Sequence, residues 1–478
     1  MARGDHGADS GPIPFGDRQR FALVALGAKN SAGHRLTMNA ADVRIPHARW
    51  IVGGAALVAC ACLFWLSRNY TFYFDEWTFI ITAPDWTLAT LFQPHNEHPS
   101  IPFRAIYWLL LNTIGLRTYL PYMAIVLLFH FVDVVLLFEF IRRRAGDLIG
   151  LVSAALLLVL GAGWEDILWA FQLAWLASVG LGLTALLMLQ GPRSPIRLAA
   201  VAALIAGSLS FSGIGVPFAV AAGVVLAATP NHRRDVVWLA PVAIALAIWY
   251  VTFGRLGNHP DPQPTAFNLL LDPVYTLWGL GASAAGLVGE GGWFGPPVLA
   301  LGLLVLALTW IRHRPDPLAL GVAAGLVAFF AVAGLTRAQL GYVQAGSGRY
   351  LYVAATLWLI LLADAARSLP WRGTWRPALV ACAFLICFNS AVLLVAFAIA
   401  RPVVMERQVA DYYALAAERN DPCLDPNGAV DPLVMPVETE PARYYRALDH
   451  YGDPAAGRSL KDRLDYESGI QRLKKPGC

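Results

Sequence analysis

The chain has 478 residues, of which 57% are hydrophobic and 14% are charged, and its formal net charge is +4. Soluble domains carry about 25% charged residues, so this deficit and the many long apolar runs exclude an ordinary soluble protein and indicate an all-α, polytopic membrane protein. The small net charge and the lack of a basic stripe exclude nucleic acid as the expected partner.

Residues 1–48 contain Gly, Asp and Arg without a sustained hydrophobic period, and we expect them to form a disordered cytoplasmic arm. The arm is too polar and too long for an ordinary signal peptide. About eleven apolar segments follow, each close to the length of a membrane span. They cover residues 50–66, 119–141, 148–163, 168–190, 196–210, 214–228, 236–253, 297–311, 318–335, 350–365 and 377–400. The pattern predicts a transmembrane domain over residues 49–400.

Arginines set the predicted orientation, because positively charged residues stay on the cytoplasmic side of a membrane. Arg142, Arg143 and Arg144 follow the second apolar segment and mark its cytoplasmic end. Applied along the chain, the rule places the amino terminus in the cytoplasm and the tail, residues 401–478, outside. We therefore expect a multi-pass protein of the inner (plasma) membrane, in contact with membrane lipid.

Some local features stay open. Residues 101–116 and 273–288 are apolar, but length and charge pattern favour interfacial or re-entrant helices over spans. Cys423 and Cys478 lie in the tail and could form a disulfide if the tail is outside the cytoplasm. The sequence alone does not establish that pairing.

Acids, histidines and prolines are concentrated in the loop after the first span, residues 72–102. Asp75 and Glu76 are adjacent just beyond the span, and Glu97 and His98 follow later in the same loop. A charge at the centre of a bilayer costs roughly 2.5–3.5 kcal/mol, so we expect these acids at the membrane surface or facing a wet cavity. Asp75 and Glu76 are either catalytic or caps of a helix start, where acids are favoured.

Further candidates lie at the predicted outer turns. Arg104 lies in the interfacial segment, Glu165 and Asp166 follow the third span, and Arg349 precedes a late span. Carboxylates can take a proton from a hydroxyl, and arginines can hold a departing phosphate. The alternatives are solvated turns for the acids and interfacial anchoring for the arginines.

We find no Gly-rich phosphate loop or nucleotide-binding domain, so no soluble cofactor is expected. His95 and His98 have a spacing that a helix could use to bind a divalent metal. The prolines on both sides oppose a regular helix there. Glu97 and His98 are therefore interpreted as substrate-contacting or structural residues, with metal binding as the alternative.

One set of residues has a familiar order: Asp75-Glu76-Trp77 after the first span, then His98-Pro99-Ser100 and Ile101-Pro102, then Gly115. This order resembles that of the GT-C fold glycosyltransferases, in the branch related to protein mannosyltransferases and aminoarabinose transferases. The resemblance covers residues 70–145 and the general topology. The family often continues His-Pro-Pro, whereas Ser100 stands at the third position here.

The resemblance implies a polyprenyl-phosphate-linked sugar as donor and an inverting transfer on the outer face. It assigns the catalytic carboxylate to Asp75, with Glu76 as its neighbour, and a second acidic site to Glu165 or Asp166. The acceptor, which could be a glycan, a lipid or a protein, is not determined.

Two other functions compete with this hypothesis. A membrane transporter or lipid flippase would place ionisable residues on broken helices near the middle of the membrane. The predicted second span does contain Asp133 and Glu139. A non-enzymatic envelope assembly protein would tolerate substitution of the acids in the outer loops and would depend on its tail.

Overall fold

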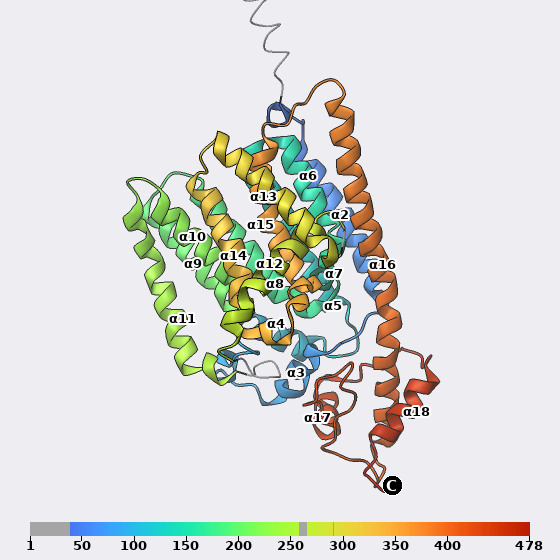
Figure 1. Ribbon diagram of the computed structural model, residues 1–478. Coiled ribbons are helices and arrows are strands. Elements are labelled where there is room, and N and C mark those ends of the chain that lie inside the picture. Colours follow the sequence, from blue (N-terminus) through green and yellow to red (C-terminus); the bar gives the residue numbers. More distant parts are fainter. Residues whose placement is uncertain (1–38, 258–264, 290) are drawn as a thin grey trace, which may run out of the picture.

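The computed structural model describes residues 39–257, 265–289 and 291–478. Within these ranges the regular structure is entirely helical, so the predicted all-α class is confirmed (Figure 1). Most of the expected amino-terminal arm, residues 1–38, lies outside the described part of the chain.

The long helices form one bundle. They are α2 (Ala48–Leu66), α5 (Leu120–Ala145), α6 (Asp147–Leu158), α8 (Leu173–Leu189), α9 (Pro195–Phe211), α10 (Gly215–Ala228), α11 (Ala240–Thr252), α12 (Asn268–Gly286), α13 (Gly295–Arg312), α14 (Pro317–Arg337), α15 (Gly348–Ala366) and α16 (Trp375–Glu418). The short helix α7 (Trp164–Leu168) lies between α6 and α8 in the chain. In the described ranges, eight helical stretches are long and apolar enough to cross a membrane. The protein is therefore a helical membrane protein.

A ninth span is present if α6 and the segment Gly161–Leu168, which bend by 43°, are counted as one. The helices α9 and α10 are apolar but shorter than this criterion requires. Each of the eleven predicted segments is helical over most of its length, but the count of eleven spans stays a prediction. The same is true of the interfacial or re-entrant character of α4 (Ile101–Thr113) and α12.

Local sequence explains where α5 stops. Gly146 follows it with φ 88°, a conformation that glycine adopts without the steric cost of a side chain. A Cβ atom at this position would come within 2.4 Å of the Ala41 carbonyl oxygen. The chain can therefore reverse directly into α6, which packs along α5.

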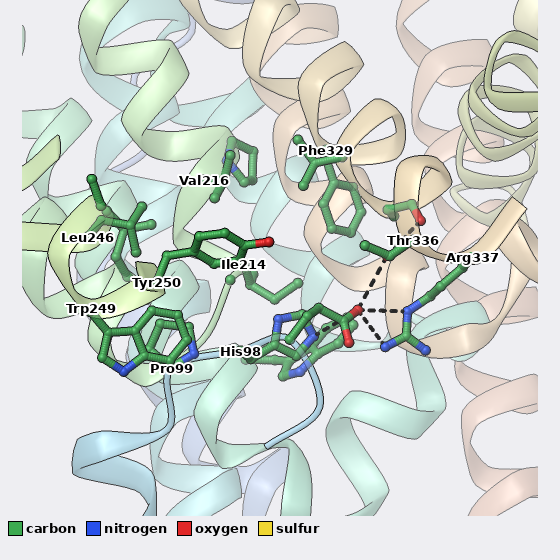
Figure 2. Close-up of a pocket in the computed structure, with 18 of the residues that line it drawn as sticks. His98, Pro99, Ile214, Val216, Leu246, Trp249, Tyr250, Phe329, Thr336 and Arg337 are labelled. Carbon is green, nitrogen blue, oxygen red and sulfur yellow. Dashed lines mark hydrogen bonds and ion pairs between the residues drawn. The ribbon is translucent and has the colours of Figure 1, made fainter. Parts of the chain in front are cut away.

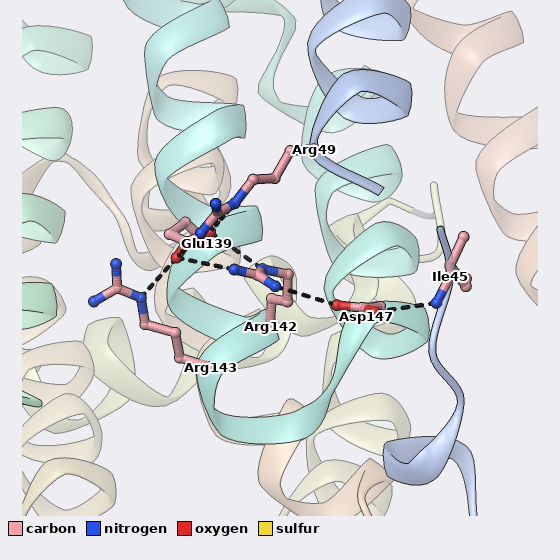
Figure 3. Close-up of polar contacts among 6 residues, drawn as sticks. All are labelled: Ile45, Arg49, Glu139, Arg142, Arg143 and Asp147. Atoms are coloured by element: carbon pink, nitrogen blue, oxygen red, sulfur yellow. Dashed lines mark hydrogen bonds and ion pairs between the residues drawn. The ribbon is translucent and has the colours of Figure 1, made fainter. Parts of the chain in front are cut away.

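One end of the bundle, called here the arginine face, carries the Arg142–Arg144 cluster. Glu139 accepts hydrogen bonds from Arg49 at 3.0 Å, Arg142 at 3.2 Å and Arg143 at 2.7 Å (Figure 3). Asp147 lies 3.5 Å from Arg142 and accepts a hydrogen bond from the Ile45 N–H at 3.1 Å. These contacts hold the residues before α2 against the turn between α5 and α6.

The opposite end, called here the loop face, carries residues 70–119 and the tail. Figure 1 shows α3 (Asp75–Thr82), α4, α17 (Pro441–Tyr451) and α18 (Arg463–Arg472) gathered there. The expected division at residue 400 lies inside α16, which continues into the tail as one helix. The rings of Trp77 and Tyr444 pack 5.1 Å apart, so the tail folds onto α3. A disulfide joins Cys423 and Cys478, with Cα atoms 5.8 Å apart.

Candidate functional site

The two adjacent acids occupy the first turn of α3. Phe74, just before them, has φ 47°, in a region that costs a non-glycine residue about 1–3 kcal/mol and persists only where the surroundings hold it. The tail supplies this support, because the Phe74 N–H donates to the Val434 carbonyl at 2.9 Å. The position of Asp75 therefore depends on a segment near the other end of the chain.

Glu76 is fully buried, and both of its carboxylate oxygens accept hydrogen bonds. Oε1 accepts from the hydroxyls of Tyr107 at 2.7 Å and Tyr119 at 3.0 Å, and Oε2 accepts from the Tyr73 N–H at 2.8 Å. Burial raises the pKa of Glu76 to about 7, although these hydrogen bonds oppose the shift. Glu76 thus ties the start of α3 to α4 and to the start of α5, and this geometry favours a positioning role, while its expected catalytic role stays a prediction.

Asp75 has a different environment. Its side chain is half-buried, and its carboxylate accepts no hydrogen bond from the residues that the structure describes. Burial raises the pKa of Asp75, while the charges of Arg349 and Arg337 oppose that shift. Neither acid caps α3 with its side chain, and the carboxylate of Asp75 remains available to accept a proton.

Glu97 and His98 meet Arg337, which comes from the end of α14 (Figure 2). Glu97 Oε1 accepts hydrogen bonds from Arg337 Nη2 at 2.7 Å and Nε at 3.1 Å, and it lies 3.9 Å from His98 Nε2. Burial would raise the pKa of Glu97, but the charges of His98 and Arg337 outweigh it and lower the pKa to about 2. Burial lowers the pKa of His98. Glu97 is therefore ionised and fixes the Arg337 guanidinium in place.

A cavity of about 440 Å³ opens beside this ion cluster. Glu97, His98 and Arg337 lie on its wall, and apolar side chains supply most of the rest, including Leu246 and Phe329 (Figure 2). The helix α11 forms one side of this cavity, and a second, mainly apolar cavity of about 430 Å³ lies along the same helix. No residue of α11 is buried, so this helix stands at the edge of the bundle (Figure 1).

The second predicted acidic site lies at the start of α7. Glu165 Oε2 is 3.9 Å from the Nε atom of Arg349, which has no hydrogen-bond partner among the described residues. Asp166 is fully buried, and neither of its carboxylate oxygens is hydrogen-bonded within the described ranges. Since Arg349 also interacts electrostatically with Asp75, it links this acidic turn to α3.

Arg104 makes no contact with the acids and arginines of the candidate site that the structure describes. Its guanidinium lies between the rings of Phe79 and Trp86, 4.8 and 5.0 Å from their centroids. It donates to the carbonyls of Gln93 at 3.2 Å and Pro94 at 3.4 Å. Arg104 therefore holds the loop together from within, which favours a structural role, while its expected contact with substrate stays a prediction.

The segment around His95 also differs from the helix that metal binding would need. His95 and His98 form a two-residue turn in which each N–H donates to the other's carbonyl, at 3.1 and 3.0 Å, with Asn96 at φ 51°. The His95 ring packs against Phe79 and Phe171, and burial lowers its pKa to about 3. In the described ranges, no three His, Cys, Asp or Glu side chains are grouped as a metal ion would need.

Sequence reasoning left Arg401 out of the candidate site. Arg401 as a whole is only 8% exposed, and its guanidinium lies over the rings of Tyr73, Trp164 and Trp169, at 5.2, 5.4 and 5.8 Å. Its Nε and Nη2 atoms have no hydrogen-bond partner in the described chain. Arg401 and Arg337 both lie at the predicted outer end of a span, where the positive-inside rule does not expect an arginine. This departure from the rule could have marked both residues as site candidates.

The chain is thus a helical membrane protein whose candidate site, at the loop face, contains partly buried and incompletely paired charges. No family model matches the chain, and no curated protein matches it. The function must therefore be inferred from the geometry of the site.

Proposed function

We propose that the protein is a membrane glycosyltransferase. It would move a sugar from a polyprenyl-phosphate-linked donor to a hydroxyl of a glycan, lipid or protein acceptor at the loop face. The observation that carries this proposal is the half-buried carboxylate of Asp75, which has no hydrogen-bond partner in the described chain and lies in the field of Arg349 and Arg337.

The chemistry follows from this pairing of one base with several cations. Asp75 takes the proton of the acceptor hydroxyl as the hydroxyl oxygen bonds to the anomeric carbon of the sugar. The bond from that carbon to the phosphate oxygen breaks, and polyprenyl phosphate leaves with the bonding electrons. Arg349, Arg337 and Arg401 are the cations that can balance the charge on the departing phosphate. Attack from the opposite side inverts the anomeric centre.

The neighbouring acids have supporting roles in this scheme. Glu97 fixes the Arg337 guanidinium through two hydrogen bonds. Glu165 lies beside Arg349 and would orient it, and Glu76 holds the start of α3 so that Asp75 projects from its first turn. His98 and Asp166 are further candidates for contact with the sugar. No soluble cofactor takes part, because the leaving phosphate is already attached to the donor.

The two cavities along α11 are suited to the lipid part of the donor. Each has a mainly apolar wall, and the larger one reaches Glu97 and Arg337 at the loop face. An isoprenoid chain could therefore lie along α11 while its phosphate meets the arginines. This arrangement explains why polar groups are confined to one part of the cavity wall.

We further propose eleven spans, with the loop face and the tail outside an inner (plasma) membrane. The arginine face carries the cluster expected on the cytoplasmic side. The disulfide between Cys423 and Cys478 supports an oxidising location for the tail. Both observations favour the same orientation.

The direct test uses Asp75→Asn in purified protein with a panel of polyprenyl-phosphate-linked sugars. Release of polyprenyl phosphate should fall by about 10²–10⁴-fold, the usual contribution of a general base. The matched control is Glu467→Gln, which changes an exposed acid of α18 that forms no hydrogen bond or ion pair with any described residue and should retain activity. Wild-type release by Asp75→Asn would refute the assignment.

One observation favours a transporter or lipid flippase as the second candidate. The helices α6 and α7 form a bent pair, and His130 Nε2 lies 3.2 Å from the Leu158 carbonyl at the break. His130 also contacts the Tyr352 hydroxyl at 2.9 Å, and that hydroxyl donates to the buried Asp133 at 3.3 Å. Broken helices beside buried ionisable groups are typical of transport sites. Movement of labelled polyprenyl phosphate across liposomes that is lost in Asp133→Asn, without sugar release, would favour this function.

A further inference from the structure

A pocket separate from the two apolar cavities, with a mainly polar wall, lies at the loop face, where the tail meets the ends of several long helices. Its volume is about 280 Å³. Its wall combines the end of the first helical stretch, the residues just before α5, the middle of α16 and a tail loop. The charged side chains that line it are Arg68, Arg117, Glu406, Arg458 and Lys461.

The pocket is basic, and its cations are not equivalent. Arg458 donates to the carbonyls of Asn69 at 3.1 Å and Tyr70 at 2.6 Å, so it holds the tail against the chain that leaves α2. Lys461 pairs with Glu406 at 2.8 Å. Two exposed arginines remain. Arg68 donates one hydrogen bond, from Nη1 to the Trp65 carbonyl at 2.9 Å. Arg117 forms no hydrogen bond or ion pair with any described residue.

The position of the pocket relative to the membrane follows from the apolar helices around it. The candidate span Ala48–Asn69 ends at the pocket, and the candidate span Leu120–Ala145 starts beside it. Trp65, one turn before Arg68, is 61% exposed, and its ring lies 3.8 Å from the Arg68 guanidinium. Exposed tryptophan at a span end is typical of the membrane–water interface. The pocket therefore lies at the level of lipid headgroups.

We infer that this pocket binds the phosphate of an anionic phospholipid headgroup. Two guanidiniums with unused donors can hold phosphate oxygens, and basic pockets at span ends attract anionic headgroups. The apolar face of α2 below Trp65 would contact the acyl chains, a contact that free phosphate lacks. This inference does not depend on the proposed glycosyl transfer.

A bound lipid would connect three parts of the molecule. The pocket is lined by the residues just after α2, the residues just before α5 and the tail, including the part of α16 that leads into it. Tyr119, which also lines it, donates its hydroxyl to Glu76 at the start of α3. A headgroup at this position would therefore stabilise the docking of the tail that supports the Phe74–Asp75 turn.

The test is native mass spectrometry of the full-length protein in detergent, titrated with phosphatidylglycerol, phosphatidylcholine or inorganic phosphate. A single phosphatidylglycerol should bind wild type, and the double variant Arg68→Gln/Arg117→Gln should weaken it by about tenfold or more, a change of about 1.4 kcal/mol. The control Arg255→Gln changes an exposed arginine after α11, outside this pocket, and should bind as wild type does.

A second variant protects the test if the double variant does not fold. Ser459→Glu adds a negative charge to an exposed loop residue of the pocket wall and should also reduce phosphatidylglycerol binding. Equal binding by wild type and both variants would overturn the inference. Equal binding of phosphatidylcholine would overturn the preference for anionic lipid, and full competition by equimolar inorganic phosphate would show a free-phosphate site instead.

Discussion

The two ends of the bundle hold their charges differently. At the arginine face, Glu139 accepts hydrogen bonds from three arginines, and Asp147 lies beside Arg142, although its Oδ1 has no hydrogen-bond partner among the described residues. At the loop face, Asp166 and Arg401 are buried with polar atoms that no described residue satisfies. An unsatisfied buried polar group costs about 1–3 kcal/mol, and a charged group costs more. We therefore expect the charges at the arginine face mainly to stabilise the fold, and we propose that the unsatisfied charges at the loop face serve the candidate site.

The largest effect that would test this comparison is on Asp75. If its charge serves chemistry and not stability, Asp75→Asn should reduce sugar transfer by about 10²–10⁴-fold. The melting temperature should stay the same or rise, because asparagine removes a half-buried charge that lacks a hydrogen-bond partner among the described residues. Scanning fluorimetry beside the transfer assay would check both. A large fall in melting temperature would show that Asp75 is structural, as Glu139 is.

The next effect concerns Glu76 and pH. Burial raises its pKa from 4.5 to about 7, so the folded protein retains a proton that the unfolded chain loses. The associated stability is fully present below pH 4.5 and is lost as pH rises through about 7. The shift corresponds to roughly 3 kcal/mol. Thermal unfolding from pH 5 to pH 8 should show this decline in the stability of wild type and a flatter dependence on pH in Glu76→Gln. The same dependence on pH in both proteins would contradict the raised pKa of Glu76.

A third effect should appear at Arg349. Arg349→Gln removes a cation proposed to balance the leaving phosphate, so transfer should fall by about 10²-fold, the lower end of the range for loss of one electrostatic donor. Arg349→Lys should recover part of the rate, since it restores charge without the planar fork. Arg255→Gln serves as the control outside the site. Unchanged turnover in Arg349→Gln would remove this residue from the phosphate site.

The smallest effect should come from the arginine face. Glu139→Gln removes the common partner of three arginines and should lower stability by about 1–2 kcal/mol, without changing transfer per folded molecule. Arg143→Gln, which removes a single half-exposed partner, should change stability by about 0.5 kcal/mol or less. Denaturation in detergent would measure both. Loss of transfer in folded Glu139→Gln would mean that the two ends are not functionally separate.

Several features were accessible from sequence because they depend on neighbouring residues. Long apolar segments identified the helical membrane class, and the helix that starts at Ile101 was expected near its observed place. The loop that carries Asp75 and Glu76 was recognised by its composition. The division of roles between these acids was not, since the tyrosines that bind Glu76 belong to other elements.

The apolar helices of membrane-spanning length, and the acids concentrated beyond the first of them, could be predicted from the order of residues, because hydrophobicity and length are local properties. The contact between Glu97 and Arg337, 240 residues away, and the pairing of Cys423 with Cys478 became apparent only in the folded chain. The same is true of the position of Arg401 among three aromatic rings. Such meetings depend on how distant helices pack, and no local pattern encodes which faces will touch.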